Sequence, residues 1–235
     1  MKTIGLIGGM SWESSAHYYR ILNQEVRARL GGTHSARILM LSLDFAEVER
    51  LQRAGDWTAL GDRMAEAARQ LEQGGAEMIL LCTNTMHKVA DRIVAATALP
   101  LLHIADPTAL AIRAAGCVRV GLLGTAFTME QDFYRARLAG HGLDVIVPDA
   151  ADRAVVHDII YRELVVGVVR DASRAAYRDV IARLVAAGAE AIILGCTEIM
   201  LLVGADDSAV PLFDTTDLHA RAAVDRALGA DDRPQ

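Results

Sequence analysis

Two segments of the chain decide its fold: Gly-Gly-Ala-Glu-Met-Ile-Leu-Leu-Cys-Thr-Asn-Thr at 74–85 and Ala-Gly-Ala-Glu-Ala-Ile-Ile-Leu-Gly-Cys-Thr-Glu at 187–198. In each segment a glycine closes a helix, a short aliphatic strand follows, and polar residues come directly after the strand. A gapless alignment sets Cys82 against Gly195 and Thr83 against Cys196. We expect the chemistry of the protein at this asymmetric pair, which has a hydroxyl in one half of the chain and a thiol in the other.

The repeat extends well beyond these two segments. Ile-Gly-Leu-Ile-Gly at 4–8 matches Val-Gly-Leu-Leu-Gly at 120–124, and Leu-Pro-Leu-Leu-His-Ile-Ala-Asp at 99–106 matches Val-Pro-Leu-Phe-Asp-Thr-Thr-Asp at 210–217. All three matches occur in the same order, which indicates a duplicated α/β unit. The alternative is that two separate α/β units share strand and turn preferences.

Short aliphatic runs alternate with longer helical patterns, as in parallel sheets built from βαβ units. We therefore predict an α/β fold of two pseudo-symmetric Rossmann-like lobes, each a mostly parallel sheet flanked by helices, with the active site in the cleft between them. The first lobe is expected to comprise 1–98 plus 210–235, because the last strand and helix are expected to pack back on it, and the second lobe 99–209. The predicted strands are 3–7, 37–43, 78–81, 119–123, 145–147, 191–194 and 210–213, and the predicted helices are 14–30, 57–73, 129–139 and 152–166.

Composition narrows the function. The chain has 235 residues, of which 52% are hydrophobic, and its formal net charge is −6, so it lacks the basic surface that nucleic-acid binding needs. It has no apolar run near the roughly 20 residues of a membrane span. Three cysteines are too few for a disulfide framework, which favours the reducing cytoplasm. We expect a small-molecule substrate, with neither nucleic acid nor membrane as partner.

The sequence offers no recognisable cofactor or metal site. Gly-Leu-Ile-Gly-Gly-Met-Ser at 5–11 lacks the Gly-x-Gly-x-x-Gly spacing of dinucleotide loops, and the chain has no Gly-Lys-Ser/Thr. No histidine pair has metal-ligand spacing, and there is no Cys-x-x-Cys. We therefore predict chemistry without a cofactor or metal. The backbone N–H groups of this glycine loop are candidates for binding a carboxylate. The alternative is that the loop is only a tight turn between strand and helix.

Cys196 is the strongest candidate for a reactive residue. It lies in a strand-end loop, where backbone N–H groups are expected to favour the thiolate, although a buried structural cysteine is the alternative. Cys82 stands one residue earlier in its repeat, so its side chain is expected on the other face of the strand, in the core. Three further polar residues lie near strand ends: His87, Lys88 and His103. Each is expected either to orient a ligand or to have only a structural role.

Three motifs together resemble the aspartate/glutamate racemase superfamily. They are Cys-Thr-Asn-Thr-Met-His-Lys at 82–88, Gly-Cys-Thr-Glu at 195–198 and Ile-Gly-Leu-Ile-Gly-Gly-Met-Ser at 4–11, and the likeness covers nearly the whole chain. It is closest to the bacterial L-aspartate/glutamate-specific racemases. The resemblance implies an amino-acid racemase that works without pyridoxal phosphate, with an active site between two lobes, and a homodimer.

The resemblance also implies roles for individual residues. Thr83 stands where many members carry a cysteine, because Asn84, Thr85 and His87 match the rest of that motif. Val165 stands where related aspartate racemases carry a lysine, so another basic group is needed for the side-chain carboxylate, and Arg50, Arg53 and Arg162 are candidates. The residues expected to hold or line the substrate are Met10, Gln52, Asn84, Thr85, Thr197 and Glu198.

Racemisation removes a proton from one face of Cα and delivers another to the opposite face. We hypothesise that Cys196 deprotonates the L-enantiomer and that Thr83 reprotonates the carbanion. A relative that uses one cysteine, such as a decarboxylase or a maleate isomerase, is an alternative enzyme. The non-enzyme alternative is a protein that binds an amino acid without catalysis.

Overall fold

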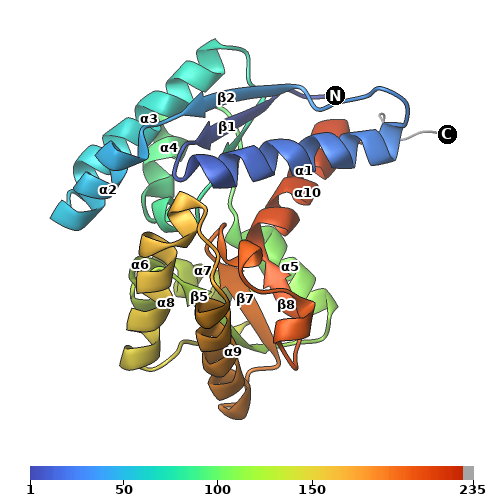
Figure 1. The fold of residues 1–235 in the computed structure, drawn as a ribbon. Helices are drawn as coiled ribbons and strands as arrows, with labels where there is room; N and C mark the ends of the chain where they lie inside the picture. Colours follow the sequence, from blue (N-terminus) through green and yellow to red (C-terminus); the bar gives the residue numbers. More distant parts are fainter. Residues whose placement is uncertain (230–235) are drawn as a thin grey trace. The chain divides into compact units, whose positions relative to one another are not determined.

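The computed structural model describes residues 1–229 and divides into two compact units. The first unit comprises Met1–Ile104 and the chain from His219 onward, and the second comprises Ala105–Leu218. Each unit holds one four-stranded parallel sheet flanked by helices (Figure 1). The predicted α/β class, with two mostly parallel sheets, is confirmed. Within residues 1–229 no helix combines the length and the apolar character that a membrane span requires.

The sheet of the first unit has the strand order β2-β1-β3-β4. Helices α1 and α10 cover one of its faces and α2 to α4 the other (Figure 1). The elements are β1 (Ile4–Gly8), α1 (Trp12–Leu30), β2 (Ile38–Ser42), α2 (Phe45–Ala54), α3 (Trp57–Gln73), β3 (Met78–Leu81), the 3₁₀ helix η1 (Thr85–Val89), α4 (Ala90–Ala96) and β4 (Leu101–Leu102).

The second unit repeats this strand order as β6-β5-β7-β8. Helices α8 and α9 pack on one face of its sheet. The elements are α5 (Ala105–Ala114), β5 (Arg119–Gly124), α6 (Ala126–Glu130), α7 (Asp132–Gly140), β6 (Asp144–Ile146), α8 (Ala150–Arg162), η2 (Leu164–Val166), α9 (Asp171–Ala186), β7 (Ala191–Gly195), η3 (Ile199–Leu201), η4 (Ala205–Asp207), β8 (Leu212–Asp214) and α10 (Thr215–Leu228), which continues into the first unit.

The two sheets share their strand register as well as their order. Ile4 lies opposite Met78 in the first unit, and Val120 lies opposite Ala191 in the second. These are the residues that the gapless alignment of the sequence repeat matches. Thr83 and Cys196 therefore follow equivalent strands at equivalent positions.

The glutamate of the repeated Gly-Ala-Glu has a structural role in both units. The side chain of Glu77 accepts a hydrogen bond from Thr3 N–H at 2.7 Å. The side chain of Glu190 accepts bonds from the N–H groups of Val118 and Arg119 at 2.7 and 3.0 Å, which hold the pKa of Glu190 below its ordinary value. Each carboxylate thus binds the chain where a central strand begins.

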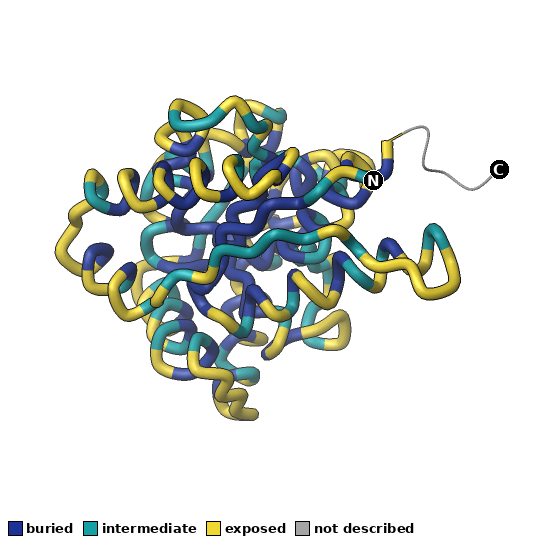
Figure 2. Tube along the Cα trace, turned by 90° about the horizontal axis from the view of Figure 1, so that it is seen from above, coloured by how far each residue is buried: buried dark blue, intermediate teal, exposed yellow. Residues whose placement is uncertain are grey.

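Side chains of β3 alternate between the two faces of the first sheet. Met78, Leu80 and Cys82 pack with α1 and α10, whereas Ile79 and Leu81 pack with α2 and α3. The central strands β1, β3, β5 and β7 are mostly buried, dark blue in Figure 2, while the outer strands are mainly intermediate and the helices alternate between buried and exposed residues. Cys82 is fully buried, and burial raises the pKa of its thiol. The prediction that Cys82 belongs to the core is confirmed.

The prediction for the last strand is wrong. Residues 210–213 were expected on the first lobe, but β8 pairs with β7 in the second sheet because Leu212 lies opposite Ile192. Only the later part of α10 joins the first unit, where Ala220 and Val224 pack in the same core as Cys82. The unit boundaries fall at Ile104 and Leu218 rather than at 98 and 209, since β4 pairs with β3. Residues 230–235 of the expected first lobe lie outside the described range.

Two predicted helices also differ. The single helix expected at 129–139 is split into α6 and α7, because Gln131 has an extended backbone with ψ of 149°. The helix expected to reach 166 ends at Arg162 and continues as a 3₁₀ turn. Helices α2, α4, α5 and α9 were not predicted. The prediction that glycines end the helices before β3 and β7 is confirmed, because Gly75 after α3 and Gly188 after α9 have positive φ.

The loop after β1 depends on a glycine that has no room for a side chain. Gly9 has φ of +86°, and a Cβ there would lie 2.1 Å from the carbonyl oxygen of Leu43. The neighbouring Gly8 C=O accepts a bond from Leu43 N–H at 3.0 Å. This loop therefore passes against the end of β2 in backbone contact.

Gly9→Ala is expected to lower the free energy of unfolding by at least about 3 kcal/mol, because it combines positive φ with a clash against backbone. Gly75→Ala is the matched control. Gly75 has φ of +89° but no atom within 4 Å of the added Cβ, so about 1–2 kcal/mol is expected. Urea denaturation measures both values, and equal losses would contradict the steric argument.

Candidate active site

In the first unit, the predicted site residues gather around the carboxyl ends of β1 and β3. Thr83, Asn84 and Thr85 come one residue after the end of β3, beyond Cys82, and Met10 follows the adjacent β1. Gln52 lies on α2, where its amide contacts Met86 Sδ at 3.3 Å. All five predicted residues are buried, and Thr83 is only 7% exposed. Four of the five, Gln52, Thr83, Asn84 and Thr85, are polar side chains that the fold buries.

Backbone contacts fix Thr83 where the strand ends. Its N–H donates to the carbonyl of Leu81 at 2.9 Å, and its own carbonyl accepts a bond from His87 Nδ1 at 2.8 Å. The next residues form η1, so the chain turns away from the sheet immediately after Thr83. These bonds hold the hydroxyl at the strand end.

The glycine loop is less free to bind a carboxylate than its sequence indicated. Gly9 N–H donates to Ser15 Oγ at 2.7 Å, and Ser14 N–H donates to Ser11 Oγ at 3.4 Å as the cap of α1. Two of the expected donors are therefore used within the chain. The strand-to-helix turn was the alternative interpretation, and these bonds support it.

In the second unit, Cys196, Thr197 and Glu198 follow β7 and are 8%, 3% and 2% exposed. Cys196 Sγ donates to Glu198 Oε2 at 3.0 Å, and Thr197 Oγ1 donates to the same oxygen at 2.9 Å. One buried carboxylate oxygen thus holds a thiol and a hydroxyl together.

The direction of the Cys196 pKa contradicts the expectation that this residue favours the thiolate. Burial raises the pKa of Cys196 well above its ordinary value, and the charge and hydrogen bond of Glu198 raise it further. The N–H groups of Thr197 and Glu198 lower it, as the sequence analysis expected, but their effect is smaller. The sequence could not reveal that the carboxylate two residues later points at the thiol.

Two further residues of this unit were missed by the sequence analysis. Tyr177 is fully buried in the same core as Cys196, and its pKa is raised by burial and by the charges of Cys196, Glu163 and Glu198. Glu163 accepts bonds from Ser173 Oγ at 2.6 Å and from Arg170 at 3.2 Å. Glu163 could have been noticed in the sequence, because it is a charged residue directly before the apolar run Leu-Val-Val at 164–166.

The basic residues considered for a side-chain carboxylate do not join these buried groups. Arg53 and Arg162 are 73% and 77% exposed at their side chains and pair with Glu49 and Asp158. Arg50 is also exposed, and Val165 packs at the edge of the second core.

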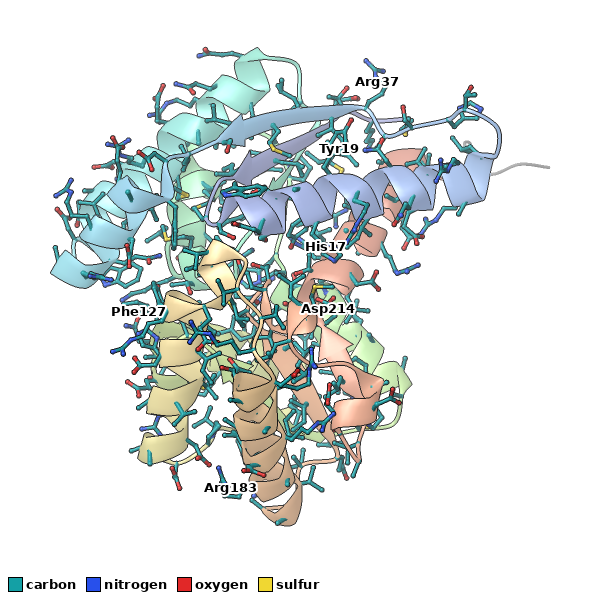
Figure 3. All side chains as sticks on the ribbon, in the orientation of Figure 1. His17, Tyr19, Arg37, Phe127, Arg183 and Asp214 are labelled. Atoms are coloured by element: carbon teal, nitrogen blue, oxygen red, sulfur yellow. The ribbon has the colours of Figure 1, made fainter. Side chains whose placement is uncertain are left out.

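Lys88 and Asp214 lie near strand ends as well. Lys88 Nζ lies 3.8 Å from the centre of the Trp57 ring, and burial lowers the pKa of Lys88. Asp214 ends β8, where α10 begins (Figure 3), and it accepts bonds from the N–H groups of Thr216 and Asp217 at 2.8 and 3.4 Å. Burial raises the pKa of Asp214. In the repeat Asp214 corresponds to His103, so the fourth strand of each unit leads into a titratable residue.

No group of three or more His, Cys, Asp or Glu side chains within residues 1–229 is arranged to hold a metal ion. The polar groups that follow β3 and β7 include the hydroxyls of Thr83, Thr85 and Thr197, the Asn84 amide, the Cys196 thiol and the Glu198 carboxylate. Such atoms suit direct binding of a small molecule that carries both carboxylate and ammonium groups.

Comparison with known proteins identifies the family. Residues 7–223 match the Asp/Glu/hydantoin racemase family. A solved structure of an Asp/Glu racemase candidate from Yersinia pestis is 57% identical, with a TM-score of 0.90 over 97% of this chain and 100% of that one. An aspartate racemase homologue from Pyrococcus horikoshii is 32% identical, with a TM-score of 0.84 and the same coverage of both chains.

A broad specificity amino-acid racemase of Bacillus subtilis is 26% identical, over 69% of this chain and 70% of its own. Glutamate racemase of Francisella tularensis, solved with D-glutamate, shares the fold with a TM-score of 0.67 at 16% identity, over 97% of this chain and 81% of its own. The resemblance predicted from the three sequence motifs is confirmed. The chain belongs to the Asp/Glu/hydantoin racemase family.

Proposed function

We propose that the protein racemises an acidic amino acid, L-aspartate or L-glutamate, at Cα without a cofactor. The observation that carries this proposal is the equivalence of Thr83 and Cys196, which follow matching strands in matching register. One unit supplies a hydroxyl and the other a thiol. Family membership supports the reaction type.

The proposed reaction uses two proton transfers. The Cα–H bond breaks, its proton moves to the Cys196 thiolate, and the electron pair is delocalised into the substrate carboxylate. The hydroxyl of Thr83 then donates its proton to the opposite face of Cα and regains one from solvent. The proposal requires Thr83 and Cys196 to reach the same substrate carbon.

Glu198 has two roles in the proposal. It holds the resting thiol protonated, and it is the carboxylate that receives the substrate ammonium. An ammonium beside Glu198 compensates the negative charge that raises the pKa of Cys196, so the thiol loses its proton to solvent as substrate binds. The Asn84 amide and the Thr85 and Thr197 hydroxyls supply donors for the substrate carboxylates and stabilise the developing negative charge.

Enantiomers have equal free energy, so kcat/KM is the same in both directions. A hydroxyl is a weaker base than a thiolate, and the two directions are therefore expected to differ in kcat and KM separately.

The proposal also includes a cytoplasmic homodimer. Free thiols at Cys82, Cys117 and Cys196 suit the cytoplasm, and the dimer rests on resemblance alone.

Cys196→Ala is expected to lower racemisation and Cα–H exchange of L-aspartate and L-glutamate by about 10²–10⁴-fold, because it removes one acid/base group. Chiral chromatography and mass spectrometry in deuterated water measure both rates. Cys117→Ala, at a half-buried cysteine, is the matched control and should keep the wild-type rate.

An unchanged rate in Cys196→Ala would reject the assignment. Consumption of a dicarboxylic substrate without racemic amino acid would favour the one-cysteine decarboxylase or isomerase, which is the second candidate because only one of the two equivalent positions carries a thiol. Tight amino-acid binding without exchange would favour a binding protein.

Glu198→Gln is expected to shift the ionisation of Cys196 to lower pH in the free protein, because it removes a negative charge beside the thiol. The rate of Cys196 alkylation by iodoacetamide, followed by peptide mass spectrometry across pH, measures this shift. Glu190→Gln is the control, since Glu190 binds backbone at the start of β5. A midpoint that stays in place or rises would contradict the role of Glu198.

Thr83→Cys is expected to raise kcat for the D-to-L direction by at least about tenfold, because a thiol is a better proton acceptor than a hydroxyl. Thr83→Ser keeps a hydroxyl and should show no such gain. Saturating kinetics with the D-enantiomer measure both. A folded Thr83→Cys variant without a gain would argue against Thr83 as the weaker acid/base.

A further inference from the structure

Two buried sets of hydrogen bonds in the first unit meet at residues 102–104 of the backbone, and the second of them reaches the backbone of Thr83. Tyr18 of α1 bonds through its hydroxyl to His219 Nδ1 at 2.8 Å, and His219 of α10 bonds through Nε2 to the carbonyl of Leu102 at 2.8 Å. Both side chains are fully buried. Two helices far apart in sequence thus meet at the end of β4.

His87 makes the second set of hydrogen bonds. Its Nε2 accepts the N–H of Ile104 at 3.2 Å, and its Nδ1 bonds to the carbonyl of Thr83 at 2.8 Å. His87 is 3% exposed, and its ring packs 4.3 Å from that of His103. His87 therefore connects the segment after β4 to the residue after β3.

The partners determine which nitrogen of each ring carries hydrogen. Leu102 offers a carbonyl, so His219 donates from Nε2, and its Nδ1 shares a hydrogen bond with the Tyr18 hydroxyl. Ile104 offers an N–H, so His87 accepts at Nε2 and donates from Nδ1. His87 thus accepts a hydrogen bond on one side of its ring and donates one on the other.

The second unit has no equivalent of His87. The alignment of the repeat sets His87 against Met200, although both units turn into a short 3₁₀ helix at this point. Cys196 is instead bonded directly by Glu198. The histidine support is therefore specific to the half that carries the hydroxyl.

We propose that His87 is a positioning residue for Thr83, and that His219 and Tyr18 steady the segment to which His87 is anchored. The inference rests on the proposed racemase function. A hydroxyl is a poor acid/base, so proton transfer through it depends strongly on its distance and angle to Cα. His87 sets these by holding the Thr83 carbonyl, which fixes the direction in which the side chain leaves the strand end.

Two substitutions separate the two bonds of His87. His87→Asn places an amide nitrogen near the position of Nδ1, so it keeps the bond to Thr83 and loses the bond to Ile104. His87→Gln places its amide near the position of Nε2, so it keeps the Ile104 bond and loses the Thr83 bond. His34→Gln, at an exposed loop histidine, is the control for a histidine change of no consequence.

The readout is the fate of the L-enantiomer in deuterated water. Deuterium incorporated with retained configuration reports proton return from Cys196, whereas inversion reports delivery by Thr83. His87→Gln is expected to raise the ratio of retention to inversion by about tenfold or more. His87→Asn and His34→Gln should keep the ratio within about threefold of wild type.

A merely structural role would lower retention and inversion together, leave the ratio unchanged and overturn the inference. Thermal denaturation reveals whether both His87 variants unfold. In that case Tyr18→Phe is the deciding variant: a raised ratio of retention to inversion supports the inference, and an unchanged ratio overturns it. A wild-type protein that neither exchanges nor inverts would reject the racemase function itself, which is a separate outcome.

Discussion

The pairing of the two central parallel strands in each unit is the constraint on which the rest of the structure depends. Parallel strands in register end together, so the residues that follow them meet at one edge of the sheet. Ile7 opposite Leu81 sets Thr83 beside the loop after β1, and Leu123 opposite Leu194 sets Cys196 in the equivalent place. The glutamates at the strand starts hold this register from the other end.

Burial then gives the two equivalent positions different chemistry. In the second unit a carboxylate, a thiol and a hydroxyl share one enclosed corner, and the charge of Glu198 opposes ionisation of Cys196. A buried charge without a partner is costly, so burial and the Glu198 carboxylate both raise the pKa of Cys196. In the first unit a histidine, His87, binds the backbone carbonyl of Thr83.

Much of the fold could be predicted because the duplication is visible in the residues. The repeat predicted two similar parallel sheets, and the period of two along β3 placed Cys82 in the core. The last strand was misplaced because a strand of three residues can join any open sheet edge, and local sequence does not select the edge. The break at Gln131 was missed because both flanking segments have helical composition.

The sequence by itself determined the family, the two-sheet architecture and the equivalence of Thr83 with Cys196, because these depend on local patterns and on the internal repeat. Only the tertiary structure decided the raised pKa of Cys196 and the hydrogen bonds by which Tyr18, His219 and His87 hold the backbone of β4 and Thr83. Those properties depend on burial and on side chains from elements distant in sequence. The physical reason is that pKa values and hydrogen-bond directions are set by neighbours in space, which no linear spacing specifies.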